Sequence, residues 1–308
     1  MQVAREYETQ ERFVPYVDDH PDGPILIGPL CISMPTALAH LFSDDGFVIA
    51  ADGFSIVRRA DGPTIESRRA QKIVHLSGID RDVACAFVGI GTLFSDAGEP
   101  AFDFTAECVK AAQTIRSRPT RDANDFASQI CLLVQQNLVA VKRGGSLSRY
   151  PRTEPPRLGE SGHTMVRIYL DGYFNGQPFR TGIRFYHVDQ ELAWGPAFHD
   201  LGRSYKSILT GSDRVARLLF DTEDPRLDKY RTDACRRVAT RYKHPDTVIT
   251  LQDAIEAARN FIAACSDPAA LEIEGKDNYH PIGGRIHIAT VTPRDGFRWV
   301  PGYEPAAQ

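Results

Sequence analysis

The pattern of hydrophobic and polar positions opens with a predicted β-hairpin. Apolar and polar residues alternate over 36–42, an Asp-Asp-Gly turn follows at 44–46, and an apolar run occupies 47–51. A tight turn between two such stretches is typical of a hairpin. Residues 53–68 contain Gly53, Asp61, Gly62 and Pro63 and are expected to form a polar loop.

Further strands and helices follow from the period of the apolar positions. Turns are expected at 171–172 and 189–190. Short apolar or alternating runs predict strands at 72–76, 83–88, 164–170, 181–188, 192–199, 284–291 and 296–300. Helical spacing predicts helices at 102–117, 123–142, 212–221 and 250–265, with Asp122 or Asn124, Ser212 and Thr250 as N-caps.

The order of these elements indicates the fold class. Runs of strands alternate with pairs of helices, which suggests two sheets packed on each other with helices outside. Residues 24–33 are apolar but contain Gly28 and Pro29, so they are expected to add an edge strand or a covering segment. The charged stretch 222–246 is interpreted as a partly helical insertion.

The composition of the chain limits the class of protein to which it can belong and the kinds of partner that it can bind. The chain has 308 residues, 42% of them hydrophobic and 25% charged, as in ordinary globular proteins. A net charge of -4 argues against nucleic acid or an anionic membrane as partner. The six cysteines include no C-x-x-C pair and are expected to be reduced core residues. The polar N-terminus lacks a signal-peptide core, and no apolar run is long enough to span a bilayer, so a cytoplasmic protein is expected.

Several short sequence motifs occur in a recognisable order along the chain. Thr36 precedes Asp52 of Ile-Ala-Ala-Asp by sixteen residues, and Lys72-Ile73 opens the next strand. Later come Gly211-Ser212 and Gly283-Gly284. Over roughly 36–300 this order resembles the proteasome β-subunit family of N-terminal nucleophile (Ntn) hydrolases and its bacterial homologues. The resemblance implies an α+β fold, a four-layer α/β/β/α sandwich of two antiparallel sheets flanked by helix pairs.

The resemblance also implies a threonine hydrolase that cleaves peptide or amide bonds. Thr36 would be the nucleophile, with its own free α-amine as base. Lys72 would keep the local potential positive, and Asp52 would keep Lys72 charged and oriented. Gly89 would donate to the oxyanion. Supporting roles would fall to Thr210, Ser212 and Asp277.

The chain departs from the family pattern before and after this core. Activity requires removal of residues 1–35, and Pro35 stands where self-cleaving precursors have Gly. Ile282 stands where a supporting Ser is usual. The alternative is therefore a catalytically inactive, structural proteasome-like subunit that retains its N-terminal segment. Each of the three residues also has a simpler explanation when it is taken singly. Thr36 would be an ordinary strand residue, Asp52 would cap the turn after its strand, and Lys72 would be an exposed residue at the start of a strand.

Other groupings of reactive residues have weaker support. Cys31 with His40 or His75 suggests a cysteine nucleophile, but Cys31 lies five residues before the expected start. His280 and His287 beside Asp277 suggest a metal site, although solvated histidines are the simpler interpretation. Neither a metal nor a cofactor is expected.

The domain organisation and the partners complete the set of expectations. Residues 1–35 are expected to be an N-terminal arm or propeptide, and 36–308 a single domain with insertions near 143–163 and 222–248. A peptide or protein is the expected substrate. The resemblance implies a homo-oligomer, with a ring among its forms, and admits an ATP-dependent unfoldase as partner.

Overall fold

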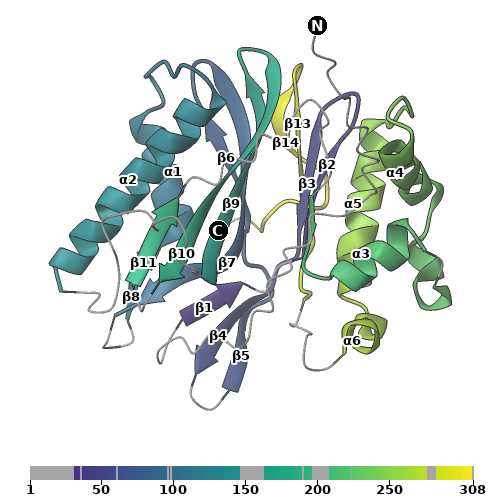
Figure 1. The fold of residues 1–308 in the computed structure, drawn as a ribbon, viewed down its shortest axis with the longest axis horizontal. Coiled ribbons are helices and arrows are strands. Elements are labelled where there is room, and N and C mark those ends of the chain that lie inside the picture. The colour runs from purple at the N-terminus through teal and green to yellow at the C-terminus, as the bar shows by residue number, and fades with distance from the viewer. Residues whose placement is uncertain are drawn as a thin grey trace, which may run out of the picture.

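The structure is a computed structural model of the 308-residue chain. It describes residues 31–34, 37–59, 62–95, 97, 99–145, 163–188, 191–195, 208–222, 224–275 and 282–306. Within them, the chain forms two antiparallel sheets and two groups of helices (Figure 1). The predicted α+β class with antiparallel sheets is confirmed.

The larger sheet has nine strands among the described residues, in the order β11-β10-β9-β7-β1-β4-β5, with β6 and β8 also paired to β7. Its strands are β1 (Cys31–Met34), β4 (Ser55–Arg59), β5 (Gly62–Ser67), β6 (Ile73–Ser77), β7 (Arg81–Phe94), β8 (Pro100–Asp103), β9 (His163–Phe174), β10 (Gln177–Val188) and β11 (Glu191–Gly195).

In the described ranges, the smaller sheet has five strands in the order β12-β2-β3-β13-β14. They are β2 (Leu38–Phe42), β3 (Phe47–Ala51), β12 (Ile208–Thr210), β13 (His287–Thr292) and β14 (Gly296–Trp299). The hairpin predicted at 36–51 is therefore the β2–β3 pair. Its turn is closed by Ser43, whose N–H donates to the Gly46 carbonyl at 2.8 Å.

The helices fall into two groups that cover different sheets. Helices α1 (Phe104–Thr114) and α2 (Ala123–Arg143) pack on β6 and β10 of the larger sheet. The second group packs on β2 and β3 chiefly through α5. It comprises α3 (Asp213–Phe220), the 3₁₀ helix η1 (Pro225–Tyr230), α4 (Asp233–Lys243), α5 (Leu251–Cys265) and α6 (Pro268–Glu274).

Three clusters of buried side chains hold these parts together. One joins α1 and α2 to the larger sheet, with Phe104, Phe126 and Phe185 at its centre. A second joins the other helices to the smaller sheet. The third draws Leu38 and Ile49 from the smaller sheet and other members from the larger one, so the two sheets face each other across an apolar layer. The predicted division into an arm and one domain stays a prediction.

Two local predictions are wrong, and both errors concern strands of the larger sheet. Residues 53–68 are not a loop, because β4 and β5 form a hairpin there beside β1. The chain also does not turn at 171–172: β9 continues to Phe174, and the turn lies at Asn175 and Gly176, which both have positive φ. At Gly172 a Cβ would collide with the backbone of β7, so this glycine marks close approach of strands rather than a turn.

The segment before the hairpin is also placed differently from the expectation of an edge strand. Residues 31–34 form β1, which pairs with β4 on one side and β7 on the other. The rest of 24–30 lies outside the described residues. Nowhere in the described ranges is a helix both long and apolar enough to cross a bilayer.

Candidate active site

The core of the site is an ion pair buried at the end of the β2–β3 hairpin. Lys72 precedes β6, and its Nζ lies 2.7 Å from Oδ1 of Asp52, which directly follows β3. Both side chains are 0% exposed. Lys72 is therefore not an exposed strand start, and that single-residue alternative is wrong. Asp52 does cap the turn after β3, because its Oδ2 accepts from the Phe54 N–H at 3.2 Å, but it binds Lys72 as well.

Backbone N–H groups complete the shell around the Asp52 carboxylate. Oδ1 also accepts from the N–H of Ala37 at 3.0 Å, and Oδ2 accepts from Gly283 at 3.1 Å and Phe54 at 3.2 Å. In return the Asp52 N–H donates to the Ala37 carbonyl at 3.1 Å. Asp52 thus fixes the backbone of Ala37, the residue that follows Thr36, on the same oxygen that binds Lys72.

The Gly283-Gly284 turn brings the third chain segment to this carboxylate. The two glycines have φ values of +157° and +79°. A Cβ on Gly284 would lie 2.5 Å from the carbonyl oxygen of Arg68. The Gly283 carbonyl accepts from Gly53 at 2.9 Å, which locks the turn against the residue after Asp52. Side chains are excluded here because three backbones meet.

Burial opposes both charges of the pair. It raises the pKa of Asp52 and lowers the pKa of Lys72, while the attraction between the two groups, and for Asp52 the Gly283 and Phe54 N–H groups, act in the opposite sense. Loss of hydration disfavours any buried ion, and a close partner of opposite charge favours it. The Lys72 ammonium consequently gives up its proton more readily than a surface lysine does.

One row of residues crosses the smaller sheet beside this pair. Thr210 of β12 lies opposite Leu38, Leu38 opposite Ala51, and Ala51 opposite His287 of β13. Leu38 and Ala51 belong to the apolar layer between the sheets. Within the described structure, the Thr210 hydroxyl is buried and lacks a hydrogen-bond partner. The sequence-predicted Thr210 thus presents an unused hydroxyl one strand from Ala37.

His287 is a member of the site that sequence reasoning treated as solvated, and that interpretation is wrong. Its side chain is 0% exposed, and both ring nitrogens lack partners among the described residues. Burial, with the charges of Arg285 and Lys72, lowers the pKa of His287 to about 4. It is the first residue of β13 and lies three residues after Gly284, and its apolar neighbours in the sequence fit a buried histidine as well as an exposed one.

Gly89, the predicted oxyanion donor, lies on β7 close to the lysine segment. Its φ is +105°, and the N–H of Phe87, two residues earlier, donates to the Lys72 carbonyl at 3.0 Å. Gly89 pairs with Val166 of β9 on one side and with Met34 of β1 on the other. The chain just before Thr36 therefore occupies the strand position next to Gly89.

The remaining predicted residues lie elsewhere or outside the described ranges. Ser212 caps α3 by accepting from Val215 at 3.2 Å, and its hydroxyl also contacts Glu274. Ile282 is buried in the cluster beneath the second helix group. Thr36 and Asp277 are outside the described residues, so their roles stay predictions.

A second buried polar cluster joins the two sheets and was not foreseen. Asp171 of β9 binds both the ring of His40 on β2 and the guanidinium of Arg180 on β10. Burial is the largest influence on His40 and lowers its pKa, whereas Arg180 and His40 hold the pKa of Asp171 below its usual value. The sequence separation of 131 residues between His40 and Asp171 left no local signal.

The chain was compared with known proteins. No family model and no curated protein matches it. Among solved structures, it is similar to the Anbu (Gly-1) mutant from Hyphomicrobium sp. strain MC1, at 12% identity and a TM-score of 0.37, covering 86% of this chain and 85% of that one. It is also similar to Anbu (ancestral beta-subunit) from Yersinia bercovieri, at 8% identity and a TM-score of 0.38, covering 87% and 88%.

These comparisons correct the family assignment that was expected from the sequence motifs. The two structures named above are Anbu proteins at very low identity and low TM-score, and no family model supports the proteasome β-subunit or Ntn-hydrolase assignment. That assignment is wrong as stated.

Proposed function

We propose that this protein hydrolyses peptide or amide bonds, with Thr36 as nucleophile once it is the first residue of the chain. The observation that carries the proposal is the shared oxygen of Asp52. It binds the Lys72 ammonium at 2.7 Å and the N–H of Ala37 at 3.0 Å, so the residue next to Thr36 is anchored beside a buried cation.

The chemistry follows from the charge at this point. In the mature chain the α-amine of Thr36 accepts the hydroxyl proton while the hydroxyl oxygen attacks the substrate carbonyl. The amine returns that proton to the departing amine of the substrate, and water then hydrolyses the acyl ester. A cation held nearby lowers the pKa of the α-amine, which keeps it neutral and able to act as a base.

Two further groups have supporting roles in the proposal. The backbone N–H of Gly89 is assigned to the oxyanion, and its location two residues from Phe87, which contacts the Lys72 segment, supports this role. The Thr210 hydroxyl is assigned to orient the nucleophile, because it is buried and unpartnered in the described structure. Ser212, already used as a helix cap, is the least supported of the predicted residues.

In this proposal, activation requires that β1 dissociate from β4 and β7 of the larger sheet. Because Met34 pairs with Gly89, the unprocessed chain fills the position that a substrate needs next to the oxyanion donor. Cleavage of the Pro35–Thr36 peptide bond would free the α-amine and release β1. The full-length chain is thus the inactive precursor in this proposal.

The four-layer arrangement belongs to the same proposal. The three buried clusters and the view in Figure 1 support an order of helices, sheet, sheet and helices. Assembly as a homo-oligomer and an ATP-dependent unfoldase as partner remain predictions.

A second candidate is a non-catalytic protein that keeps its N-terminal segment. The observation in its favour is again β1, which is hydrogen-bonded on both sides within the larger sheet. Removing it would cost the sheet an interior strand. The two candidates make opposite predictions for the N-terminus of the native protein.

The test combines intact mass with hydrolysis of a fluorogenic peptide amide. We expect a chain that starts at Thr36 and cleaves the peptide, reduced activity for Thr36→Ser, and none for Thr36→Ala. Thr247→Ala, a change of the same kind in the segment that joins α4 to α5, serves as the matched control and should cleave at the wild-type rate. A native chain that retains residues 1–35 and shows no hydrolysis would establish the second candidate instead.

A further inference from the structure

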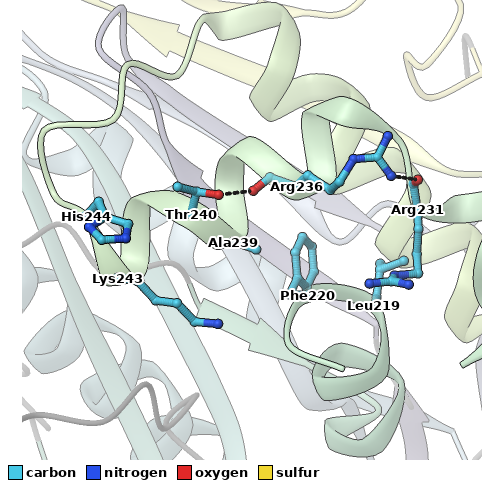
Figure 2. Close-up of a pocket in the computed structure, with 8 residues that line it drawn as sticks. All are labelled: Leu219, Phe220, Arg231, Arg236, Ala239, Thr240, Lys243 and His244. Atoms are coloured by element: carbon cyan, nitrogen blue, oxygen red, sulfur yellow. Dashed lines mark hydrogen bonds between the residues drawn. The ribbon is translucent and has the colours of Figure 1, made fainter. Parts of the chain in front are cut away.

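A pocket lies on the second helix group and shares no residue with the candidate active site (Figure 2). Its volume is about 260 Å³, and it is formed by the end of α3, the residue after η1, and α4. It is lined by Leu219, Phe220, Arg231, Arg236, Ala239, Thr240, Lys243 and His244.

The lining divides into an apolar floor and a cationic rim. Leu219, Phe220 and Ala239 supply the floor, and apolar wall exceeds polar wall in the pocket as a whole. The rim carries the cations Arg231, Arg236 and Lys243. Among the described residues, no acidic side chain lines the pocket.

Acidic residues near the rim lie outside the lining. Asp228 approaches Arg231 only to 3.8 Å and is itself 64% exposed. Asp233 binds the Arg236 guanidinium from the preceding turn of α4. Asp221, next to Phe220 in the chain, interacts electrostatically with Lys243. The acidic partners therefore stand behind the cations, and the charged side chains of the lining itself are all basic.

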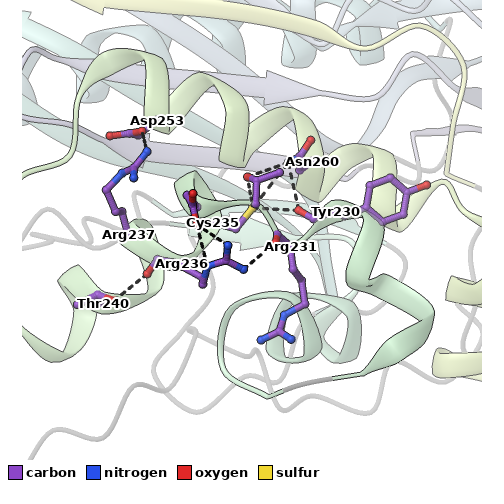
Figure 3. A network of polar contacts seen from close by, with 10 residues as sticks. Tyr230, Arg231, Cys235, Arg236, Arg237, Thr240, Asp253 and Asn260 are labelled. Atoms are coloured by element: carbon purple, nitrogen blue, oxygen red, sulfur yellow. Dashed lines mark hydrogen bonds and ion pairs between the residues drawn. The ribbon is translucent and has the colours of Figure 1, made fainter.

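The wall that carries Arg231 is fixed by a polar network (Figure 3). The Arg231 carbonyl accepts from Arg236 Nη1 at 3.0 Å. The preceding carbonyl, of Tyr230, accepts from Asn260 Nδ2 at 3.1 Å and from Cys235 Sγ at 3.3 Å. Both α4 and α5 therefore hold this segment, and a pocket that is already formed loses little entropy when it binds a ligand.

We propose that this pocket binds a small organic anion, a carboxylate attached to an apolar body the size of one ring or a short chain. Arginine and lysine at the rim suit a carboxylate, and the floor suits the apolar body. The volume of about 260 Å³ lies just below the range of drug-sized ligand sites, which limits the body to this size. This binding site is independent of the proposed hydrolase.

The experiment compares three probes on the full-length protein by calorimetry and ligand-observed NMR. Phenylacetate has both the charge and the apolar body, benzyl alcohol has only the body, and inorganic phosphate has only the charge. We expect phenylacetate to bind with a dissociation constant on the order of 1 mM, weakening at high salt, and the other two to bind at least about tenfold more weakly. Equal binding of phosphate or of benzyl alcohol, or no binding of phenylacetate, would overturn the proposal.

Variants locate the site. Arg231→Gln and Lys243→Gln should each weaken phenylacetate binding by about tenfold, because each removes a charge-assisted contact. Ala239→Leu should abolish binding by filling the floor. Arg217→Gln is the matched control, since it removes the same charge from an exposed position of α3 outside the lining. Circular dichroism checks that each variant is folded, and wild-type affinity in all three pocket variants would refute the assignment.

Discussion

Asp52 and Lys72 carry charge in an environment without solvent, since both side chains are 0% exposed. A buried ion pair gains attraction but loses hydration, so its net contribution to stability is small even when its geometry is good. Here three backbone N–H groups share the carboxylate with the lysine. Removing either charge would leave the other one buried without its counter-ion. The arrangement is therefore stable only while the carboxylate, the ammonium and the backbone N–H groups are all present.

Removing one charge of this pair should therefore be severe. We expect Lys72→Met to lower the free energy of unfolding by about 3–5 kcal/mol, because Asp52 is left as an uncompensated buried charge. Chemical denaturation measures the loss. Lys110→Met is the control: Lys110 pairs with Glu107 at 2.6 Å but is 64% exposed, and its replacement should leave stability unchanged. Similar losses in both variants would contradict the burial of Lys72.

The burial of His287 predicts that the stability of the fold depends on pH. Its folded-state pKa is about 4 against 6.5 for the ordinary group, so between these values the unfolded chain binds a proton that the folded chain does not. Stability must then fall as pH is lowered from 6.5 toward 4. Burial lowers the pKa of His40 as well, which adds a loss of the same sign.

Denaturation midpoints at a series of pH values test this dependence. We expect His287→Gln to flatten the decline between pH 6.5 and 4, and the wild type to retain it. A wild-type profile that is flat in this window would show that His287 is solvated, as the sequence alone suggested.

Among the structural elements, the turn at Gly283 and Gly284 controls the geometry of the site. It presents the Gly283 N–H to Asp52 and lies against Arg68 and Phe54. Since both glycines adopt positive φ, the turn depends on the absence of a side chain as well as on backbone freedom.

A pair of alanine substitutions separates these two requirements. Gly284→Ala meets backbone at 2.5 Å, whereas Gly302→Ala, at a similar φ of +86°, meets nothing within 4 Å. We expect about 1 kcal/mol of destabilisation from φ alone at Gly302 and at least about 2 kcal/mol more at Gly284. Thermal unfolding compares them, and equal losses would show that the chains do not converge at the turn.

Elements with strong local signals were predictable from the sequence, and those that depend on distant partners were not. The β2–β3 hairpin follows from its alternation and its Asp-Gly turn, and α5 from its period and the capping box of Thr250 with Asp253. The β4–β5 hairpin was missed because Gly62 and Pro63 suggested a loop, while β1 supplies the strand that it pairs with. Short β12 has only three residues and no pattern of its own.

The site itself was predictable only in part. The sequence motifs that contain Asp52, Lys72 and Gly283 pointed to residues that the structure brings together. The sequence did not reveal that β1 lies beside Gly89, since strand order is set by long-range pairing. Nor did it reveal the burial of His287, because one histidine in an apolar strand fits either face.

For the molecule as a whole, the two sheets are joined by a polar contact as well as by apolar packing. Asp171 of the larger sheet binds His40 of the smaller one, and Arg180 lies on the same carboxylate. All three side chains are almost fully buried. Their position across the layer between the sheets makes the contact sensitive to how the sheets are aligned.

Asp171→Asn should therefore destabilise the whole fold. We expect a loss of about 3–5 kcal/mol in the free energy of unfolding, because Arg180 would lie buried without this carboxylate. Asp82→Asn is the control, since Asp82 contacts His75 at 2.6 Å with 34% of its side chain exposed, and its loss should be clearly smaller. If Asp171→Asn unfolded at the wild-type denaturant concentration, the sheets would not be held by this cluster.

In the proposed function, Asp52 and Lys72 activate Thr36 in a chain that has lost residues 1–35. The most direct measurement is mass spectrometry of the native protein after reaction with a β-lactone, which acylates a reactive hydroxyl. We expect a chain beginning at Thr36 with one adduct, located on residue 36 by fragmentation and absent from Thr36→Ala. A chain that still carries β1 and forms no adduct at residue 36 would contradict it.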